Sequence, residues 1–233
     1  MSSRDAILSK LRAGLGVKAN DPARRATVDA RIAGKSRHLQ PERISGKSPN
    51  QLLKLFRGFL EGQSATVVDV DDRNAIPSAI ATYLRTNNLP ARLRVGGDSM
   101  LTQLPWGSEA HLEVLLGKAQ PADEVGLTHA TAAVAETGTM LLTSGAENPV
   151  TINFMPENHI VVVEEKDLVA SYEDGWERIR ARFGDRTMPR TVNFISGPSR
   201  TGDIGGRLVM GAHGPRRMCV IIVKDQDEAA PAT

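Results

Sequence analysis

Cysteine and aromatic residues are scarce in this 233-residue sequence, which has a single cysteine, Cys219, and only 4% aromatic residues. One thiol cannot form an internal disulfide, and it cannot supply the four thiolates that hold most iron-sulfur clusters. Any iron-sulfur cluster involved in the function is therefore expected on a partner protein and not on this chain.

Long hydrophobic runs are also missing. Even the apolar runs Ile160 to Val163 and Cys219 to Val223 fall far short of the roughly 20 residues that a membrane helix needs. The sequence therefore predicts no membrane span. The start, MSSRDAILSKLRAGLG, carries charges throughout and has no apolar region before a small-residue cleavage site, so it does not have the pattern of a secretory signal. We expect a cytoplasmic protein.

The sequence has the composition of a folded globular protein, with 40% hydrophobic and 24% charged residues. Its net charge of +2 hides a division, because the first 60 residues hold 13 basic and 4 acidic residues while the remainder is acidic. Nucleic-acid binding is disfavoured, since the only aromatic residues of this basic segment, Phe56 and Phe59, lie three apart on an apolar helical face and fit a core. A basic surface for an acidic body or partner is the better interpretation.

Three helices are predicted within residues 1–60. The first is a short amphipathic helix that stops near Gly14, and the second runs from Pro22, at its first turn, to about Ala33. The third follows a capping box formed by Ser48 and Gln51, and its buried stripe extends to Leu60. This basic helical segment is expected to be an N-terminal extension of the main domain.

From Ala65 the pattern changes to short β-branched runs that alternate with helical stretches, which is typical of βαβ units. The predicted strands are TVVDV, ARLRV, HLEVLL, TMLLTS, HIVVVE, TVNFIS and MCVIIV. Several are continuously apolar, as expected for parallel strands covered on both faces. We therefore predict a three-layer α/β domain with a Rossmann-like sheet over residues 61–224, followed by a flexible tail at 225–233.

A small-residue loop, SGPSRTGD, directly follows the predicted strand TVNFIS. Loops at the carboxyl ends of strands are favoured ligand sites, and hydroxyls, free N–H groups and an arginine can together hold a phosphate or carboxylate. The loop has neither Walker nor dinucleotide-binding spacing. A turn that caps a following helix is the open alternative. The candidate ligand residues here are Ser196, Gly197, Ser199, Arg200, Thr201 and Asp203, of which Asp203 is also the expected helix cap.

A second candidate lies in AVAETGTMLL, where Glu136 has apolar neighbours in the sequence. A carboxylate in such surroundings is costly unless it is paired or its pKa is raised, so Glu136 is a candidate general base, nucleophile or ribose-type hydrogen-bond acceptor. The open alternative is a hairpin turn at the sheet surface, with Gly138 making the tight turn. Thr137, Gly138 and Thr139 are candidate ligand-binding residues.

Three histidines, His129, His159 and His213, lie near these loops without metal-binding spacing, so no metal site is predicted. His213, in the stretch GAHGP, is the best placed for ligand contact and is a second candidate catalytic residue, with Gly214 beside it. No nucleophile elbow accompanies Ser199, which argues against a hydrolase. Gly96-Gly97-Asp98, after ARLRV, only weakly resembles a phosphate-binding turn, and a plain turn is the better interpretation. Asp72-Arg73, after TVVDV, could either reach a crevice or pair on the surface.

The motifs AETGT, PENHIVVV, SGPSRTGDI and GAHGP, in this order and at these intervals, closely resemble the LUD domain family, as found in lactate utilization proteins of type C. The resemblance covers roughly Glu61 to Val223. It implies a fold of the NagB/RpiA/CoA-transferase type and a role beside two iron-sulfur partner proteins that oxidise L-lactate to pyruvate. A chain with Cys219 alone matches the cluster-free member of that system.

The resemblance supplies no catalytic residue, so the site roles above rest on the residues themselves. The expectation is a non-redox subunit whose domain binds a small anionic ligand or a cofactor of unknown identity. The alternative is a stand-alone enzyme of the sugar-phosphate isomerase or acyl-CoA transferase type, with Glu136 as base or nucleophile.

Overall fold

A computed structural model describes residues 2–18, 20–34, 37, 39–184, 187–204 and 206–225, of which 203 and 204 are described for the backbone only. The chain forms two compact units, residues 1–39 and residues 40–233. The first unit contains α1 (Ser3–Gly14) and α2 (Pro22–Gly34), and neither helix has a buried residue. Both predicted helices are thus present, but their apolar side chains are exposed.

Helix α3 (Pro49–Gly62) is part of the second unit. It begins at the predicted capping box, in which Ser48 and Gln51 bond to each other's backbone N–H groups. Phe56 and Leu60 on its apolar stripe are completely buried. The expected domain boundary near residue 60 therefore falls inside this unit, because the stripe packs into its core.

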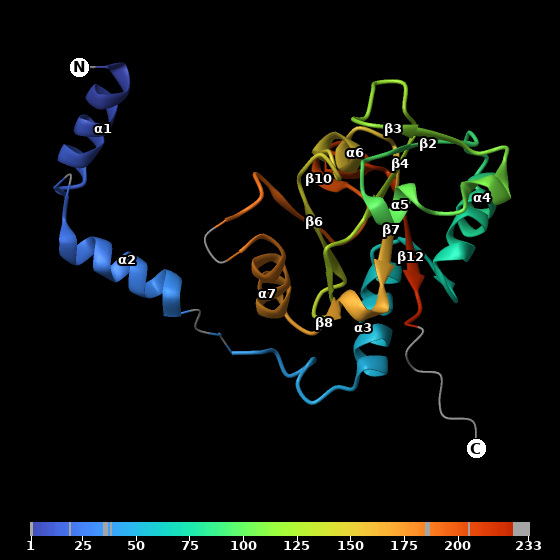
Figure 1. The fold of residues 1–233 in the computed structure, drawn as a ribbon, viewed down its shortest axis with the longest axis horizontal. Coiled ribbons are helices and arrows are strands. Elements are labelled where there is room, and N and C mark those ends of the chain that lie inside the picture. Colours follow the sequence, from blue (N-terminus) through green and yellow to red (C-terminus); the bar gives the residue numbers. More distant parts are fainter. Residues whose placement is uncertain are drawn as a thin grey trace. The chain divides into compact units, whose positions relative to one another are not determined.

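The second unit is built on a six-stranded sheet in which all neighbouring strands are parallel (Figure 1). This sheet confirms the predicted Rossmann-like α/β class. Along the sheet the strands are β1 (Thr66–Val70), β12 (Arg217–Val223), β7 (Asn158–Glu164), β4 (Val125–His129), β2 (Arg92–Val95) and β3 (Glu113–Leu116).

A smaller sheet covers one face of the large one, together with α3. Its strands are β8 (Leu168–Val169), β5 (Ala132–Val134), β6 (Thr139–Thr143) and β9 (Val192–Ile195), in that order. Alternate residues of β7 show the two faces: Ile160 and Val162 belong to the core shared with α4 (Ile76–Thr86), whereas Val161 and Val163 belong to the core shared with α3 and the small sheet. Because both faces are buried, the strand is continuously apolar.

Helix α7 (Tyr172–Phe183) covers the outer face of the small sheet, where Ile179 packs against Val134 and Leu141. The layers are thus α4, the parallel sheet, the small sheet with α3, and α7. Figure 1 shows α4 and α7 on opposite sides of the strands. A second sheet therefore occupies the layer that a helix would fill in a plain three-layer arrangement.

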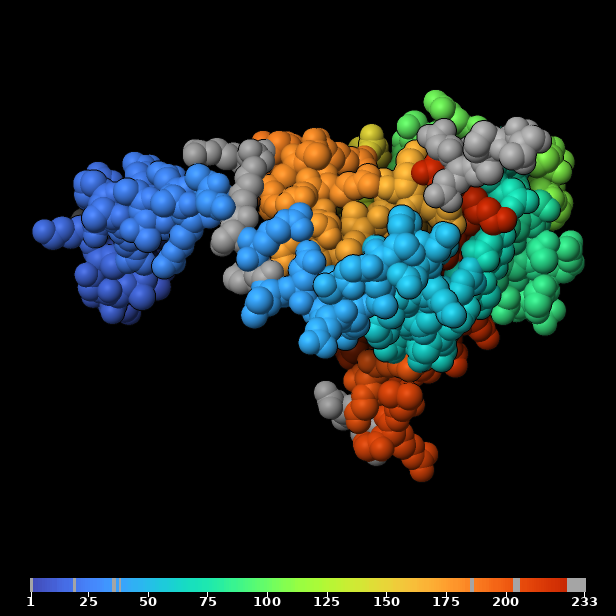
Figure 2. All heavy atoms as spheres, turned by 90° about the horizontal axis from the view of Figure 1, so that it is seen from below, coloured from blue at the N-terminus to red at the C-terminus, as the bar shows by residue number. Residues whose placement is uncertain are grey.

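One local prediction is wrong. No helix begins after Ser199; instead β10 (Arg200–Ile204) and β11 (Arg207–Met210) form an antiparallel hairpin, with Thr201 opposite Val209. Figure 2 shows this hairpin, coloured orange-red, projecting from the rest of the second unit. The backbone N–H groups of residues 202–204 therefore form no helix N-terminus, and Asp203, whose side chain lies outside the described residues, caps no helix.

The short elements of the second unit are the 3-10 turns η1 (Arg73–Ala75), η2 (Trp106–Glu109) and η3 (Glu165–Asp167), and the helices α5 (Ser99–Thr102) and α6 (Val150–Phe154). Within the described ranges, no helix is both long enough and apolar enough to cross a membrane. The predicted tail at 225–233 lies outside the described residues except for Asp225.

Candidate functional site

The AETGT segment forms the turn between β5 and β6. Gly138 has a positive φ of 66°, and a Cβ atom there would lie 2.5 Å from the Cβ of Phe59 on α3. Glycine is therefore required both by the left-handed backbone and by the close approach of the helix. The turn lies directly against α3.

Four hydroxyl groups form a closed network next to this turn. Thr137, Thr139 and Tyr172 bond to one another over 2.7 to 2.9 Å, and the Thr139 hydroxyl also lies 2.7 Å from that of Ser196. Each hydroxyl has one hydrogen to donate. If Thr137, Thr139 and Tyr172 each donate to the next hydroxyl around the triangle, and Ser196 donates to Thr139, every hydroxyl hydrogen is used once. This network connects β6, α7 and the end of β9. Ligand binding by Thr137, Thr139 and Ser196 stays a prediction.

Glu136 is paired rather than isolated. Its Oε1 lies 3.8 Å from an Nη2 atom of Arg43, and its side chain is 13% exposed. The backbone N–H of Glu136 donates to the Ala170 carbonyl over 3.1 Å. A positive partner is what a mostly buried carboxylate needs, so the ion pair accounts for Glu136 without a catalytic role. That role stays a prediction.

The SGPSR loop links β9 to the projecting hairpin. The Arg200 guanidinium donates to the Gln63 carbonyl oxygen and, over 2.6 Å, to the Ser64 hydroxyl, both just beyond the end of α3. Gly197 also lies against Gln63. Arg200 thus satisfies carbonyl and hydroxyl acceptors that follow a helix C-terminus, and it is already engaged in the position where an anion was expected.

The structure brings Ser199 and the GAHGP stretch together. The Ser199 hydroxyl accepts from the backbone N–H of His213 over 3.2 Å, and the Ser199 backbone N–H donates to the Pro215 carbonyl over 2.8 Å. The His213 residue is exposed, and Gly214 lies beside Ser199. Across the described residues, no hydrogen bond or ion pair joins Glu136 to His213, so the two candidate catalytic residues are not brought into contact.

A different set of charged residues gathers at the carboxyl edge of the parallel sheet. Nδ1 of His129, at the end of β4, lies 3.2 Å from Oδ2 of Asp98, and its Nε2 lies 3.6 Å from Oε2 of Glu164 at the end of β7. The other oxygen of Glu164 accepts two hydrogen bonds from Arg73, of 2.8 and 2.6 Å. Asp98, His129, Glu164 and Arg73 thus form a continuous row, which we name the edge row.

Both carboxylates of the edge row are held in the charged form. Burial raises the pKa of Asp98, but the hydrogen bond and charge of His129 outweigh it and bring the pKa below its usual value. Burial likewise raises the pKa of Glu164, and Arg73, Lys166 and His129 together lower it to a net value below the usual one. Asp98 and Glu164 are therefore both negatively charged, and the adjacent Arg73 and Lys166 neutralise Glu164.

A metal ion is disfavoured at this row. His129, Glu164 and Asp167 could each direct one ligand atom to a common point, because these atoms lie within 4.8 Å of one another. However, Arg73 and Lys166 already bind Glu164, and Arg178 lies 2.8 Å from Asp167. Three cations around two carboxylates leave little negative charge for a metal. The absence of a metal site stays a prediction.

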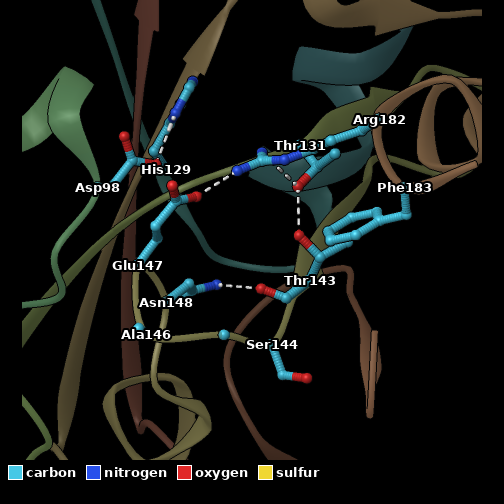
Figure 3. A pocket seen from close by; sticks show the side chains of 11 residues that line it. Asp98, His129, Thr131, Thr143, Ser144, Ala146, Glu147, Asn148, Arg182 and Phe183 are labelled. Atoms are coloured by element: carbon cyan, nitrogen blue, oxygen red, sulfur yellow. Dashed lines mark hydrogen bonds and ion pairs between the residues drawn. The ribbon is translucent and has the colours of Figure 1, made fainter. Parts of the chain in front are cut away.

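A pocket of about 400 Å³ adjoins the edge row (Figure 3). It lies beyond the carboxyl ends of the neighbouring strands β2 and β4. From β2 the chain continues towards the β3 edge of the sheet, whereas from β4 it continues to β7 on the other side. Open α/β sheets bind ligands at such switch points. The lining residues are Asp98, His129, Thr131, Thr143, Ser144, Gly145, Ala146, Glu147, Asn148, Arg182 and Phe183.

Gly96 allows one wall of this pocket to form. A Cβ atom on Gly96 would lie 1.9 Å from the Glu147 carbonyl oxygen and 2.8 Å from the Pro149 side chain. The loop after β6 can thus pack directly on the end of β2, and the Gly97 N–H donates to the Ala146 carbonyl over 3.3 Å. The Gly96-Gly97-Asp98 stretch, for which the sequence favours a plain turn, thus contributes Asp98 to the pocket lining.

His159 has no part in the pocket. It is completely buried, and its Nε2 lies 2.7 Å from the Thr128 hydroxyl. Burial lowers the pKa of His159 to about 3, so the ring is neutral. This histidine belongs to the interior of the sheet.

The edge row was not predicted because strand β4, whose sequence VGLTH is short and contains a glycine, was not predicted. Without that strand, His129 could not be placed at a strand end beside Asp98. A usable signal was present nonetheless: Asp98, Arg73 and Glu164 each stand at or within three residues of the end of a predicted strand.

Comparison with known proteins gives one consistent result. The profile of the LUD domain family matches residues 60–223. Lactate utilization protein C of Halalkalibacterium halodurans is 38% identical over 49% of this chain and 50% of its own, and the corresponding protein of Exiguobacterium is 28% identical over 97% of both chains. The chain thus matches about half the length of the first relatives and nearly the whole of the Exiguobacterium one.

One solved structure also matches. A crystal structure of a DUF162 family protein from Deinococcus radiodurans has 25% sequence identity and a TM-score of 0.59, over 76% of this chain and 99% of that one. The match agrees with the α/β fold described above. It concerns the fold and adds no residue to the site.

Proposed function

This chain belongs to the LUD domain family, and from that membership we propose that it serves lactate utilization as a subunit without an iron-sulfur cluster. It works beside two iron-sulfur proteins, which carry the electrons when L-lactate is oxidised to pyruvate. The observation that carries this proposal is the relative from Exiguobacterium, named lactate utilization protein C, which aligns over 97% of both chains.

The state of Cys219 supports the assignment of electron transfer to partners. The residue is buried in the core, and burial raises the pKa of its thiol to about 12. The thiolate, not the thiol, is the ligand that binds metals. A protonated thiol inside a parallel sheet is unsuited to hold iron.

Residues 1–39 are the region we assign to partner docking. The segment holds nine basic and three acidic residues. None of the described residues of its two helices is buried, and the large apolar side chains of Ile7, Leu11, Val28 and Ile32 are about half exposed or more. Apolar stripes flanked by positive charge fit an acidic partner with an apolar groove.

Co-purification tests the proposal. The tagged chain, isolated from its native cell grown on lactate, is expected to bring down two iron-sulfur proteins, identified by mass spectrometry. The chain alone is expected to be colourless and to reduce no dye with lactate. Iron in stoichiometric amount, or lactate turnover by the isolated chain, would refute the assignment.

The SGPSR loop stays our candidate for a small anionic ligand. Ser199 and His213 support it, since they meet at the base of the projecting hairpin. Calorimetry with lactate and pyruvate tests it with Ser199→Ala and Arg200→Gln, and Arg207→Gln, an exposed arginine on the same hairpin, is the control. Weaker binding in the first two variants alone is expected; equal affinity in all three contradicts the assignment.

A further inference from the structure

The switch-point pocket is chemically distinct from an anion site. Its lining contains two carboxylates, Asp98 and Glu147, against one guanidinium, Arg182, and the His129 ring is already bonded to Asp98. The charge of the lining is thus not positive, and a phosphate or a second carboxylate would meet repulsion. The pocket favours a ligand that is uncharged where it meets these groups.

The polar groups of the pocket have unused hydrogen-bonding capacity. Arg182 and Glu147 form an ion pair, yet their side chains are 41% and 58% exposed, so further N–H groups and lone pairs remain accessible.

The side-chain types match a ligand rich in hydroxyls. Carboxylates only accept hydrogen bonds and the guanidinium only donates, whereas neighbouring hydroxyls of a ligand can do both at once. Figure 3 shows Glu147, Asn148 and Arg182 around one space, with the Phe183 ring at its side. An aromatic ring provides an apolar surface for the C–H face of a sugar ring. Acidic residues at the edge of a parallel sheet are known to bind ribose hydroxyls.

We propose that this pocket binds a vicinal diol, as carried by a free sugar or by the ribosyl group of a nucleoside. The hydroxyl hydrogens bond to the Glu147 carboxylate, and the hydroxyl oxygens accept from the Arg182 guanidinium. The edge row holds Asp98 in the charged form at the back of the pocket. The volume of about 400 Å³ lies in the range of small-molecule sites.

Titration calorimetry on the full-length chain tests the proposal with three probes: D-ribose, adenosine and 2′,3′-dideoxyadenosine. Adenosine or ribose is expected to bind, and the dideoxy compound at least about tenfold more weakly than adenosine. Tighter binding of adenosine than of ribose identifies the nucleoside source, and similar binding of both identifies the sugar itself. Equal affinity for adenosine and its dideoxy analogue, or no binding of any probe, overturns the proposal.

Substitutions locate the binding. Glu147→Ala and Arg182→Ala change exposed side chains, so both variants are expected to fold, and each is expected to weaken binding at least about tenfold. Arg180→Ala, on the same helix but outside the pocket, is the matched control and is expected to bind normally. If all three variants bind alike, the diol binds elsewhere and the assignment of the pocket is wrong.

Discussion

Replacement of Glu164 by glutamine probes the edge row directly. The carboxylate accepts two hydrogen bonds from Arg73, and Lys166 and His129 lie 3.3 and 3.6 Å from it. Glutamine keeps the size of the side chain but removes the charge that these three groups share. The variant therefore isolates electrostatics from packing.

The expected loss in the free energy of unfolding is about 2 kcal/mol at pH 7. Breaking a buried ion pair costs about 3 to 5 kcal/mol, and Glu164 itself is only 10% exposed. Arg73 and Lys166 are about half exposed, so water takes over part of their interaction after the substitution and reduces the cost.

The effect must depend on pH. The pKa of Glu164 is lowered in the folded chain from its usual 4.5, so the folded state binds fewer protons than the unfolded state when the pH falls to this range. The stabilisation by the carboxylate is complete above about pH 5 and is lost as the pH falls through the folded pKa. The difference between wild type and Glu164→Gln is therefore expected to shrink towards zero on acidification.

Urea unfolding at pH 7, 5 and 4, followed by circular dichroism, measures both effects. Glu157→Gln is the control, because Glu157 is exposed and directly precedes the first residue of the same strand; it should change stability by less than about 0.5 kcal/mol. If Glu164→Gln is as stable as the control at pH 7, or if its deficit is unchanged at pH 4, the electrostatic account of the edge row is wrong.

Three further outcomes are expected. Gly96→Ala should lower the free energy of unfolding by about 1 to 3 kcal/mol in denaturant titrations, because its Cβ would lie 1.9 Å from a carbonyl oxygen, whereas Gly107→Ala, with open space around it, should not. Thr139→Val should cost about 1 to 3 kcal/mol in the same assay, since it removes the central hydroxyl of the buried network. Removal of residues 1–39 should leave the melting temperature of the remainder unchanged and abolish the salt-sensitive part of partner binding in pull-downs; a lower melting temperature would contradict the division into two units.

Periodicity and capping were sufficient to predict most elements. The stripe ending in Phe56 and Leu60 and the Ser48 cap predicted α3, and the apolar runs predicted β7 and β12. The β10–β11 hairpin was missed because the small residues of SGPSRTGD fit a helix-capping turn equally well. The second sheet was missed because the strand β5, AAV, has only three residues and carries no alternation.

The edge row depends on strand order, which no local pattern contains. Asp98 and His129 are 31 residues apart, and Arg73 and Glu164 are 91 apart. They meet because β4 pairs with both β2 and β7, and because parallel strands end at the same edge. Local spacing motifs instead favoured the small-residue loops, in which hydroxyl groups and Arg200 bond to other groups of the protein.

The same strand order explains why the edge row and the pocket occur together. Strands β2, β4 and β7 are neighbours in the sheet. Strand β4 ends in His129, β7 ends in Glu164, and Asp98 follows the end of β2, so the histidine lies between two carboxylates. The switch in chain direction between β2 and β4 leaves a gap beyond those strand ends, which the loop after β6 and the end of α7 enclose as a pocket. The contacts with His129 and with the backbone N–H of Met100 fix Asp98 at the back of that gap, so the pocket is preorganised for a ligand that donates hydrogen bonds.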